Sequence, residues 1–179
     1  MIEFRAFARE DFKWLIEHVE TPEFLLQWSG SQFHFPLTEE QLESYWQTSQ
    51  KEEADVYMFT VLHEEQGTVI GHISFKVDLR NQSARIGKVL VGDPQMRGQG
   101  IGTQMVEKIL MIAFEEMNLH RVNLGVFDFN HSAITCYEKI GFIKEGLLRE
   151  CRKIGEEYWS QWEMGILSRE WRKNKQLND

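Results

Sequence analysis

The sequence predicts one domain, residues 1–179, of the mixed α/β (α+β) class, with about four helices and a sheet of about six to seven strands. Short runs rich in β-branched and aromatic residues predict the strands, and apolar residues spaced at i, i+3, i+4 and i+7 predict the helices. The predicted elements follow the order β-α-α-β-β-β-α-β-α-β-β. No Pro/Gly/Ser-rich linker divides the 179 residues, a length sufficient for one hydrophobic core.

The first third of the chain is predicted to contain one strand and two helices. Apolar and polar residues alternate over 2–6, which predicts a strand. Apolar residues from Phe12 to Val19 follow the helical period, so a helix with one buried face is expected there. An irregular aromatic stretch runs from Phe24 to Phe35. Thr38 and Gln41 then resemble a capping box and predict the start of the second helix.

The same two periods predict the remaining elements. Two β-branched runs on either side of the turn 64–67 predict a hairpin. The strands expected after the second helix are Val56–His63, Val69–Val77, Ala84–Val91, Arg121–Phe127, Phe142–Leu148 and Tyr158–Ile166. The helices expected there are 101–118, 133–140 and a frayed charged tail from Arg169. Asn130 to Ser132 is typical of a helix start, and Gly141 is typical of a helix end.

A glycine-rich loop joins the strand that ends at Val91 to the helix that follows. Glycines at 98, 100 and 102 lack the Cβ atoms that would keep a ligand from the backbone, and the first N–H groups of a helix are unpaired. This arrangement favours a phosphate, to which Arg97 could add a charge-assisted hydrogen bond. The spacing excludes a P-loop, and Thr103 occupies the position where a Rossmann fingerprint needs its third glycine. A plain strand-to-helix turn is the alternative.

A second motif, N-x-x-A-x-x-x-Y-E-K-x-G-F, occupies residues 130–142. Together with R-x-x-G-x-G at 97–102 and the element order, it resembles the GNAT superfamily of N-acetyltransferases. The resemblance implies a mixed, mostly antiparallel sheet splayed at its fourth strand, with cofactor motifs at 89–103 and 130–142. The segment from Glu145 to Trp171 is similar to the branch that contains ribosomal-protein N-terminal (Rim-type) and spermidine acetyltransferases.

The resemblance implies acetyl-CoA as the cofactor and a role for each motif. The strand would bind the pantetheine arm and the thioester oxygen through its backbone, and the loop would bind the pyrophosphate. These residues are Val89, Leu90 and Val91 in the strand, and Arg97, Gly98, Gln99, Gly100, Ile101, Gly102 and Thr103 in the loop. Asn130 and Lys139 would contact the cofactor, and Ser132 and Ala133 would line its channel. Tyr137 would contact the cofactor and protonate the CoA thiolate as the general acid.

The general base is not identified by the motifs. Many relatives carry a glutamate two residues before a glycine of the fourth strand, and this sequence has Arg85 there, before Gly87. His72, Glu145 and Glu150 are candidate replacements, each with a plain structural role as the alternative. Deprotonating a lysine-like amine at pH 7 costs about 4.6 kcal/mol, whereas an α-amine costs about 1.1 kcal/mol. Without a strong base the α-amine is the easier substrate.

The acceptor site is expected near the first two helices. The aromatic stretch from Trp28 through Phe33 to Phe35, together with Trp46, lies where the family builds this site. These side chains could form a lid over the substrate or belong to the core. The candidate substrate residues are Trp28, Phe33, His72 and Glu145.

We therefore expect an N-acetyltransferase that acts on a primary amine, such as a protein N-terminal α-amine. The alternatives are a polyamine or other small-amine acetyltransferase and a non-catalytic acyl-CoA-binding module. A net charge of -8 argues against a nucleic-acid partner and fits a cationic amine.

The remaining sequence features bear on location and partners. No apolar run approaches the about 20 residues of a membrane helix, and the charged first residues do not resemble a signal peptide, which predicts a cytoplasmic protein. Cys136 and Cys151 have no zinc-like spacing, so we expect reduced cysteines and no metal. The resemblance also makes a homodimer a candidate assembly.

Overall fold

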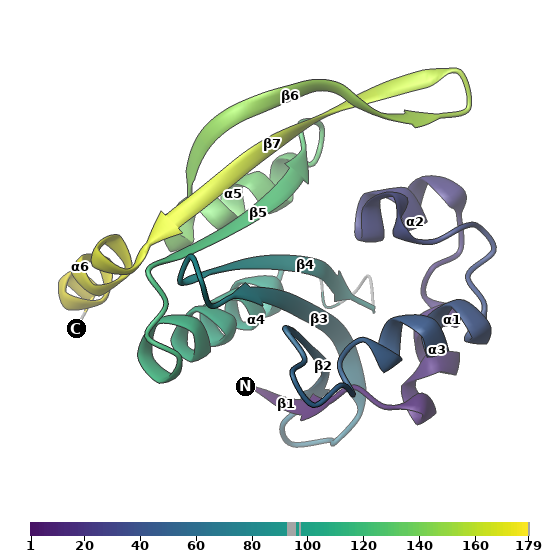
Figure 1. The fold of residues 1–179 in the computed structure, drawn as a ribbon, viewed down its shortest axis with the longest axis horizontal. Coiled ribbons are helices and arrows are strands. Elements are labelled where there is room, and N and C mark those ends of the chain that lie inside the picture. Colours follow the sequence, from purple (N-terminus) through teal and green to yellow (C-terminus); the bar gives the residue numbers. More distant parts are fainter. Residues whose placement is uncertain (93–95, 97, 179) are drawn as a thin grey trace. The chain divides into compact units, whose positions relative to one another are not determined.

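A computed structural model describes residues 1–92, 96 and 98–178, and its strands form one seven-stranded sheet (Figure 1). The strand order is β1-β2-β3-β4-β5-β7-β6. The pair β4–β5 is parallel, whereas β1–β2, β2–β3, β5–β7 and β6–β7 are antiparallel. The predicted mixed, mostly antiparallel α/β architecture is therefore confirmed.

The chain divides into two compact units, which are described separately below. Unit 1 comprises Met1–Lys76 and Gly87–Met105, and unit 2 comprises Val77–Ile86 and Val106–Asp179. Within the described residues no helix is long and apolar enough to span a membrane.

Unit 1 contains the first three strands and three short helices. The strands are β1 (Ile2–Ala6), β2 (Val56–His63) and β3 (Val69–Asp78, of which the last two residues belong to unit 2). The helices are α1 (Phe12–Glu17), α2 (Pro22–Ser29) and α3 (Glu39–Gln47). The Thr38 hydroxyl accepts from the Gln41 N–H at 3.3 Å, so the predicted start of α3 is correct.

One prediction in unit 1 was wrong, because α2 occupies part of the stretch expected to be irregular. The Thr21 hydroxyl caps this helix by accepting the Phe24 N–H at 3.1 Å, and Pro22 stands in its first turn. Both residues are standard helix-start signals. The helix buries Leu25 and Trp28 in an apolar core shared with α1, α3 and β2.

Unit 2 contains the other strands and the longer helices. Its strands are the first residues of β4 (Ser83–Val91), β5 (Arg121–Phe127), β6 (Ile143–Ile154) and β7 (Glu157–Leu167). Its helices are most of α4 (Ile101–Met111, followed by a π-helical turn at Ile112–Glu116), α5 (His131–Ile140) and α6 (Ser168–Asn178). The described residues thus form six α-helices, more than the roughly four expected from the periodicity.

The two last strands form a longer hairpin than predicted. β6 continues to Ile154 rather than ending at Leu148, and β7 pairs with β5 only from Gln161 onward. The hairpin therefore extends past the end of β5, as the yellow-green ribbons of Figure 1 show. The register of β6 shifts between Leu148 and Arg152, which is where the alternation that predicts a strand is lost.

Candidate functional site

The residues of unit 1 that are predicted to bind the acyl carrier have the predicted secondary structure, and their contact with the cofactor stays a prediction. Val89, Leu90 and Val91 are the last three residues of β4, and α4 begins at Ile101. Gly98 and Gly100 have φ angles of 78° and 81°, and an added Cβ on either would meet open space. A left-handed backbone that is open to its surroundings and lies at a helix N-terminus suits an approaching phosphate. Arg97 lies outside the described residues.

In unit 2 the second motif forms α5 and its two caps. The Asn130 side chain accepts the Ala133 N–H at 3.3 Å and the Ser132 hydroxyl at 3.1 Å, and Gly141 ends the helix with φ of 114°. The motif thus has a visible structural role in starting and ending one helix. Contact of Asn130, Ser132, Ala133 and the exposed Lys139 with a cofactor stays a prediction.

Tyr137 lies on the buried face of α5. Its side chain is 8% exposed, and its ring centroid is 5.9 Å from that of Phe142. Burial, and to a lesser extent Cys136, raises the pKa of Tyr137 above its ordinary value. The phenol therefore keeps its proton at neutral pH, which a proton donor requires.

The predicted acceptor residues of unit 1 pack against one another around β3. We call Trp28, Phe33, Tyr45 and His72 the aromatic cluster. Ring centroids are 5.8 Å apart for Trp28 and Phe33, 5.5 Å for Phe33 and Tyr45, and 6.0 Å for Trp28 and His72. All four side chains are less than one-tenth exposed. Packing is thus one role of these residues, and contact with a substrate stays a prediction.

Trp46 packs against the core that contains Trp28, Phe33 and Tyr45. Its indole N–H donates to the Phe7 carbonyl at 3.0 Å, and the Arg9 guanidinium lies 4.3 Å from its ring centroid. Both contacts tie α3 to the segment after β1. Trp46 therefore anchors α3, and its contact with a substrate stays a prediction.

His72 is the most deeply buried titratable group of the cluster. Its Nε2 lies 3.2 Å from the Tyr45 hydroxyl, and its Nδ1 has no partner among the described residues. Burial, followed by the charge of nearby Lys88, lowers the pKa of His72 to about 3. A neutral imidazole with so low a pKa is a weak proton acceptor at pH 7.

Sequence reasoning missed Lys88, which lies on β4 directly before Val89. Its Nζ is 4.7 Å from the Tyr45 ring centroid and 5.9 Å from that of Phe33. Burial lowers the pKa of Lys88 to about 8. The signal in the sequence was a lysine inside the apolar run Ile86–Val91, where a charge is unusual.

The other candidate bases are in unit 2, where two carboxylates are held by arginines. Glu145 accepts two hydrogen bonds from Arg121, which lowers the pKa of Glu145 below its usual range. Arg85, which stands at the place of the family glutamate, donates to both oxygens of Glu163 at 2.6 and 2.7 Å. The Arg85 charge is therefore matched by a carboxylate on β7.

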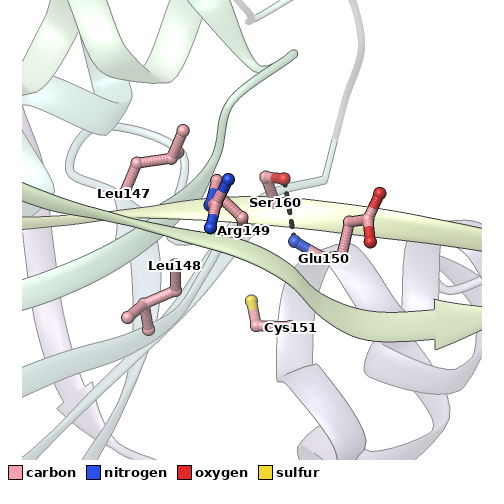
Figure 2. A pocket seen from close by; sticks show the side chains of 6 residues that line it. All are labelled: Leu147, Leu148, Arg149, Glu150, Cys151 and Ser160. Atoms are coloured by element: carbon pink, nitrogen blue, oxygen red, sulfur yellow. Dashed lines mark hydrogen bonds between the residues drawn. The ribbon is translucent and has the colours of Figure 1, made fainter.

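Glu150 lies in a pocket on the hairpin of unit 2 (Figure 2). Its N–H donates to the Ser160 hydroxyl at 3.0 Å, and its φ of 51° is left-handed. Leu148 pairs with Gln161 and Arg152 with Trp159, so three residues of β6 face Ser160 alone. Figure 2 shows the pocket at this bulge, which is lined by Leu147, Leu148, Arg149, Glu150, Cys151 and Ser160.

The comparisons with known proteins agree with the motifs. The description "Acetyltransferase (GNAT) family" matches residues 22–142, which confirms the family resemblance. The chain is 31% identical to the putative ribosomal N-acetyltransferase YdaF of Bacillus subtilis over 61% of this chain and 59% of that protein. It is 29% identical to the spermidine N(1)-acetyltransferase of Vibrio cholerae over 60% of this chain and 61% of that protein.

A solved structure shows the same fold over nearly the whole chain. It is a spermidine N-acetyltransferase from Vibrio cholerae in complex with CoA and spermine. The TM-score is 0.81 at 23% identity, and the match covers 96% of this chain and 98% of that chain.

Proposed function

Because the chain belongs to the acetyltransferase (GNAT) family and takes acetyl-CoA as its co-substrate, we propose that its acceptor is an α-amine, such as a protein N-terminus. One observation carries this choice. The carboxylates of Glu145 and Glu163 are each bound by a guanidinium group, so neither is free to deprotonate or to bind a strongly basic amine. An α-amine is about 2.6 pKa units less basic than a lysine-like amine, so it loses its proton at neutral pH with less need of a base.

In this proposal the acetyl group passes directly from the thioester to the amine. The glycine loop and Val89–Val91 bind the cofactor, so that the carbonyl carbon is presented to the amine nitrogen. The C–N bond forms and the nitrogen gives up one proton, while the C–S bond breaks with its electron pair going to sulfur. Tyr137 then donates its phenolic proton to the thiolate and recovers a proton from solvent.

The test is release of free CoA thiol from acetyl-CoA with a panel of acceptors. The panel contains peptides with free and with acetylated N-termini, spermidine and single amino acids. We expect thiol release with free-N-terminus peptides and none with the blocked ones. Faster release with spermidine than with any peptide would overturn the proposed acceptor but not the acetyltransferase activity.

A polyamine is the second candidate acceptor, and two observations favour it. The net charge of -8 attracts a polycation, and the spermidine acetyltransferase of Vibrio cholerae is a relative at 29% identity. The pairing of Glu145 and Glu163 with arginines argues against it, because polycations are bound by free carboxylates. Ionic strength separates the two candidates, since binding of a polycation weakens steeply with salt.

The role of Tyr137 has its own test. Tyr137→Phe removes the proton donor and keeps the packing against Phe142, so we expect kcat to fall about 100-fold while the Kd for acetyl-CoA changes less than about 2-fold. The matched control is Tyr158→Phe, on the exposed part of the hairpin in the same unit, which should leave kcat unchanged. An unchanged kcat for Tyr137→Phe would remove Tyr137 from the chemistry.

A further inference from the structure

Lys88 is a residue of unit 1 to which neither motif assigns a role. It directly precedes Val89, the first of the three strand residues that would hold the acyl arm of the cofactor. Its φ of 52° is left-handed, although it is not a glycine and lies inside a strand. Ser74 fixes the backbone beside it, because the Ser74 hydroxyl donates to the Gly87 carbonyl at 3.3 Å. Backbone strain held in place by neighbours is typical of functional positions.

The ammonium group of Lys88 has two aromatic rings as neighbours. Tyr45 and Phe33 present their rings to it, and the side chain is half-buried, so part of it remains accessible to a substrate. In the part of the chain that the structure describes, no carboxylate forms an ion pair with Lys88. A lysine that is partly removed from water and lacks a carboxylate gives up its proton more easily than an exposed lysine.

Two buried polar atoms of the aromatic cluster also lack a partner among the described residues. Trp28 Nε1 and His72 Nδ1 have no hydrogen-bond partner among the described residues, and their side chains are 6% and 1% exposed. Nearly all buried polar atoms in native proteins are hydrogen-bonded, and the exceptions call for a specific explanation. Together with Lys88, these atoms indicate that the aromatic cluster is prepared for a polar ligand.

We propose that Lys88, in its neutral form, is the general base that accepts a proton from the attacking amine. This inference rests on the proposed function. Lys88 Nζ first takes a proton from the ammonium form of the bound substrate, which frees the nitrogen lone pair. The nitrogen then bonds to the thioester carbon and loses its second proton to solvent, and the C–S electron pair leaves with sulfur. Sulfur takes its proton from the general acid, and Lys88 later releases its proton to solvent. The net products are the amide and free CoA thiol.

His72, Tyr45, Ser74 and Phe33 face Lys88. Of these groups and Lys88, it is Lys88 that titrates near neutral pH. His72 from β3 is neutral, because burial lowers its pKa to about 3. Tyr45 from α3 keeps its proton, because burial raises the pKa of its phenol. Ser74 from β3 and Phe33 carry no charge. The pKa of Lys88, about 8, lies where a base is both unprotonated in part and strong enough to act.

This pKa also matches one acceptor class better than the other. Proton transfer from an α-ammonium group of pKa about 7.8 to a base of about 8 is nearly balanced. Transfer from a lysine-like ammonium group of pKa about 10.4 is unfavourable by about 250-fold. A base of this strength therefore serves an α-amine and serves a polyamine poorly.

The experiment measures kcat against pH for the full chain, with saturating acetyl-CoA and a free-N-terminus peptide, or spermidine if only spermidine is turned over. The variants are Lys88→Met, which removes the base, and Lys88→Arg, which keeps a charge that cannot be lost. The matched control is Lys76→Met, an exposed lysine on β3. Calorimetric binding of acetyl-CoA to each variant checks that the fold is intact, and Lys88→Gln replaces any variant that does not bind.

We expect the wild-type kcat to rise with pH through an inflection near pH 8 and to level off above about pH 9. Both Lys88 variants should lose about 100-fold in kcat at pH 8 and the inflection near pH 8, with unchanged acetyl-CoA binding. Lys88→Arg with near wild-type kcat would overturn the base role in favour of a charge role, and an unchanged Lys88→Met would overturn both. If the wild-type protein turns over no amine, the proposed function and this inference fall together, whereas turnover that is insensitive to Lys88 overturns only the inference.

Discussion

Two cationic side chains, Arg85 and Lys88, lie three residues apart on β4 and have different neighbours. Arg85, in unit 2, is 45% exposed and donates to both oxygens of Glu163. Lys88, in unit 1, is half-buried over aromatic rings, has a left-handed backbone and has no carboxylate partner among the described residues. Among the described residues, Arg85 thus has a carboxylate partner and Lys88 has none. An arrangement that lowers stability is retained where it serves function, which is why we assign chemistry to Lys88 and not to Arg85.

Gly71 of unit 1 differs from two glycines of unit 2 in what surrounds it. In unit 2, an added Cβ on Gly125 would meet the ends of the Arg85 and Gln161 side chains. Gly165 likewise leaves room for the Arg121–Glu145 pair, so an arginine reaches across a glycine to a glutamate twice. In unit 1, a Cβ on Gly71 would lie 2.6 Å from the backbone carbonyl oxygen of Leu90. Gly125 and Gly165 thus leave room for the ends of side chains, whereas Gly71 leaves room for the backbone of a neighbouring strand.

The largest effect is therefore expected for Gly71→Ala. A backbone carbonyl cannot move aside as a side-chain end can, so β3 and β4 must separate at Leu90, and the free energy of unfolding should fall by about 3 kcal/mol. Urea denaturation measures this change. Gly146→Ala on β6, where an added Cβ meets nothing within 4 Å, is the control and should change stability by less than about 0.5 kcal/mol. Equal effects at the two positions would contradict the assignment of Gly71.

Local patterns predicted most of the fold. The alternation in β1 and the hairpin of β2 and β3 depend on side chains within a few residues of one another, and the caps of α3 and α5 are local hydrogen bonds. The errors have local causes too. Thr21 and Pro22 signalled the start of α2, and the bulge at Glu150 broke the alternation that would have extended β6.

The candidate site was predicted only in part, because its electrostatics depend on distant segments. The glycine loop and the Asn130 to Phe142 motif are contiguous and could be recognised. Lys88 acquires its environment from Phe33 and Tyr45, far earlier in the chain, and Arg85 acquires Glu163 from far later. Neither pairing leaves a periodic trace in the sequence.

A second effect tests whether Lys88 is retained at the expense of stability. Its folded pKa of about 8 lies below its ordinary value of 10.5, so the unfolded chain binds more protons between these values. The free energy of unfolding contributed by Lys88 therefore rises as pH increases from about 8 to about 10, and the full penalty is present below pH 8. Lys88→Met removes the buried charge and should stabilise the protein by about 2 kcal/mol at pH 7.

The difference between wild type and Lys88→Met should narrow as pH is raised toward 10, which thermal or urea unfolding at several pH values would show. Lys76→Met, an exposed lysine on β3, should give a difference that does not change with pH over this range. A Lys88→Met variant that is less stable than wild type at pH 7 would mean that the aromatic rings compensate the ammonium fully. Lys88 would then be a satisfied cation like Arg85.

The smallest effect is expected for the Arg85–Glu163 pair. A double-mutant cycle with Arg85→Met and Glu163→Gln should give a coupling energy of about 0.5 kcal/mol, because an exposed ion pair is screened by water and salt. Neither variant should alter the pH at which kcat levels off, since Arg85 is three residues removed from the proposed base and its charge is already matched. A coupling energy above about 2 kcal/mol, or a shifted kcat profile, would mean that the paired cation also tunes the chemistry. Arg85 and Lys88 would then both influence the reaction, and the assignment of a structural role to Arg85 and a catalytic role to Lys88 would be too sharp.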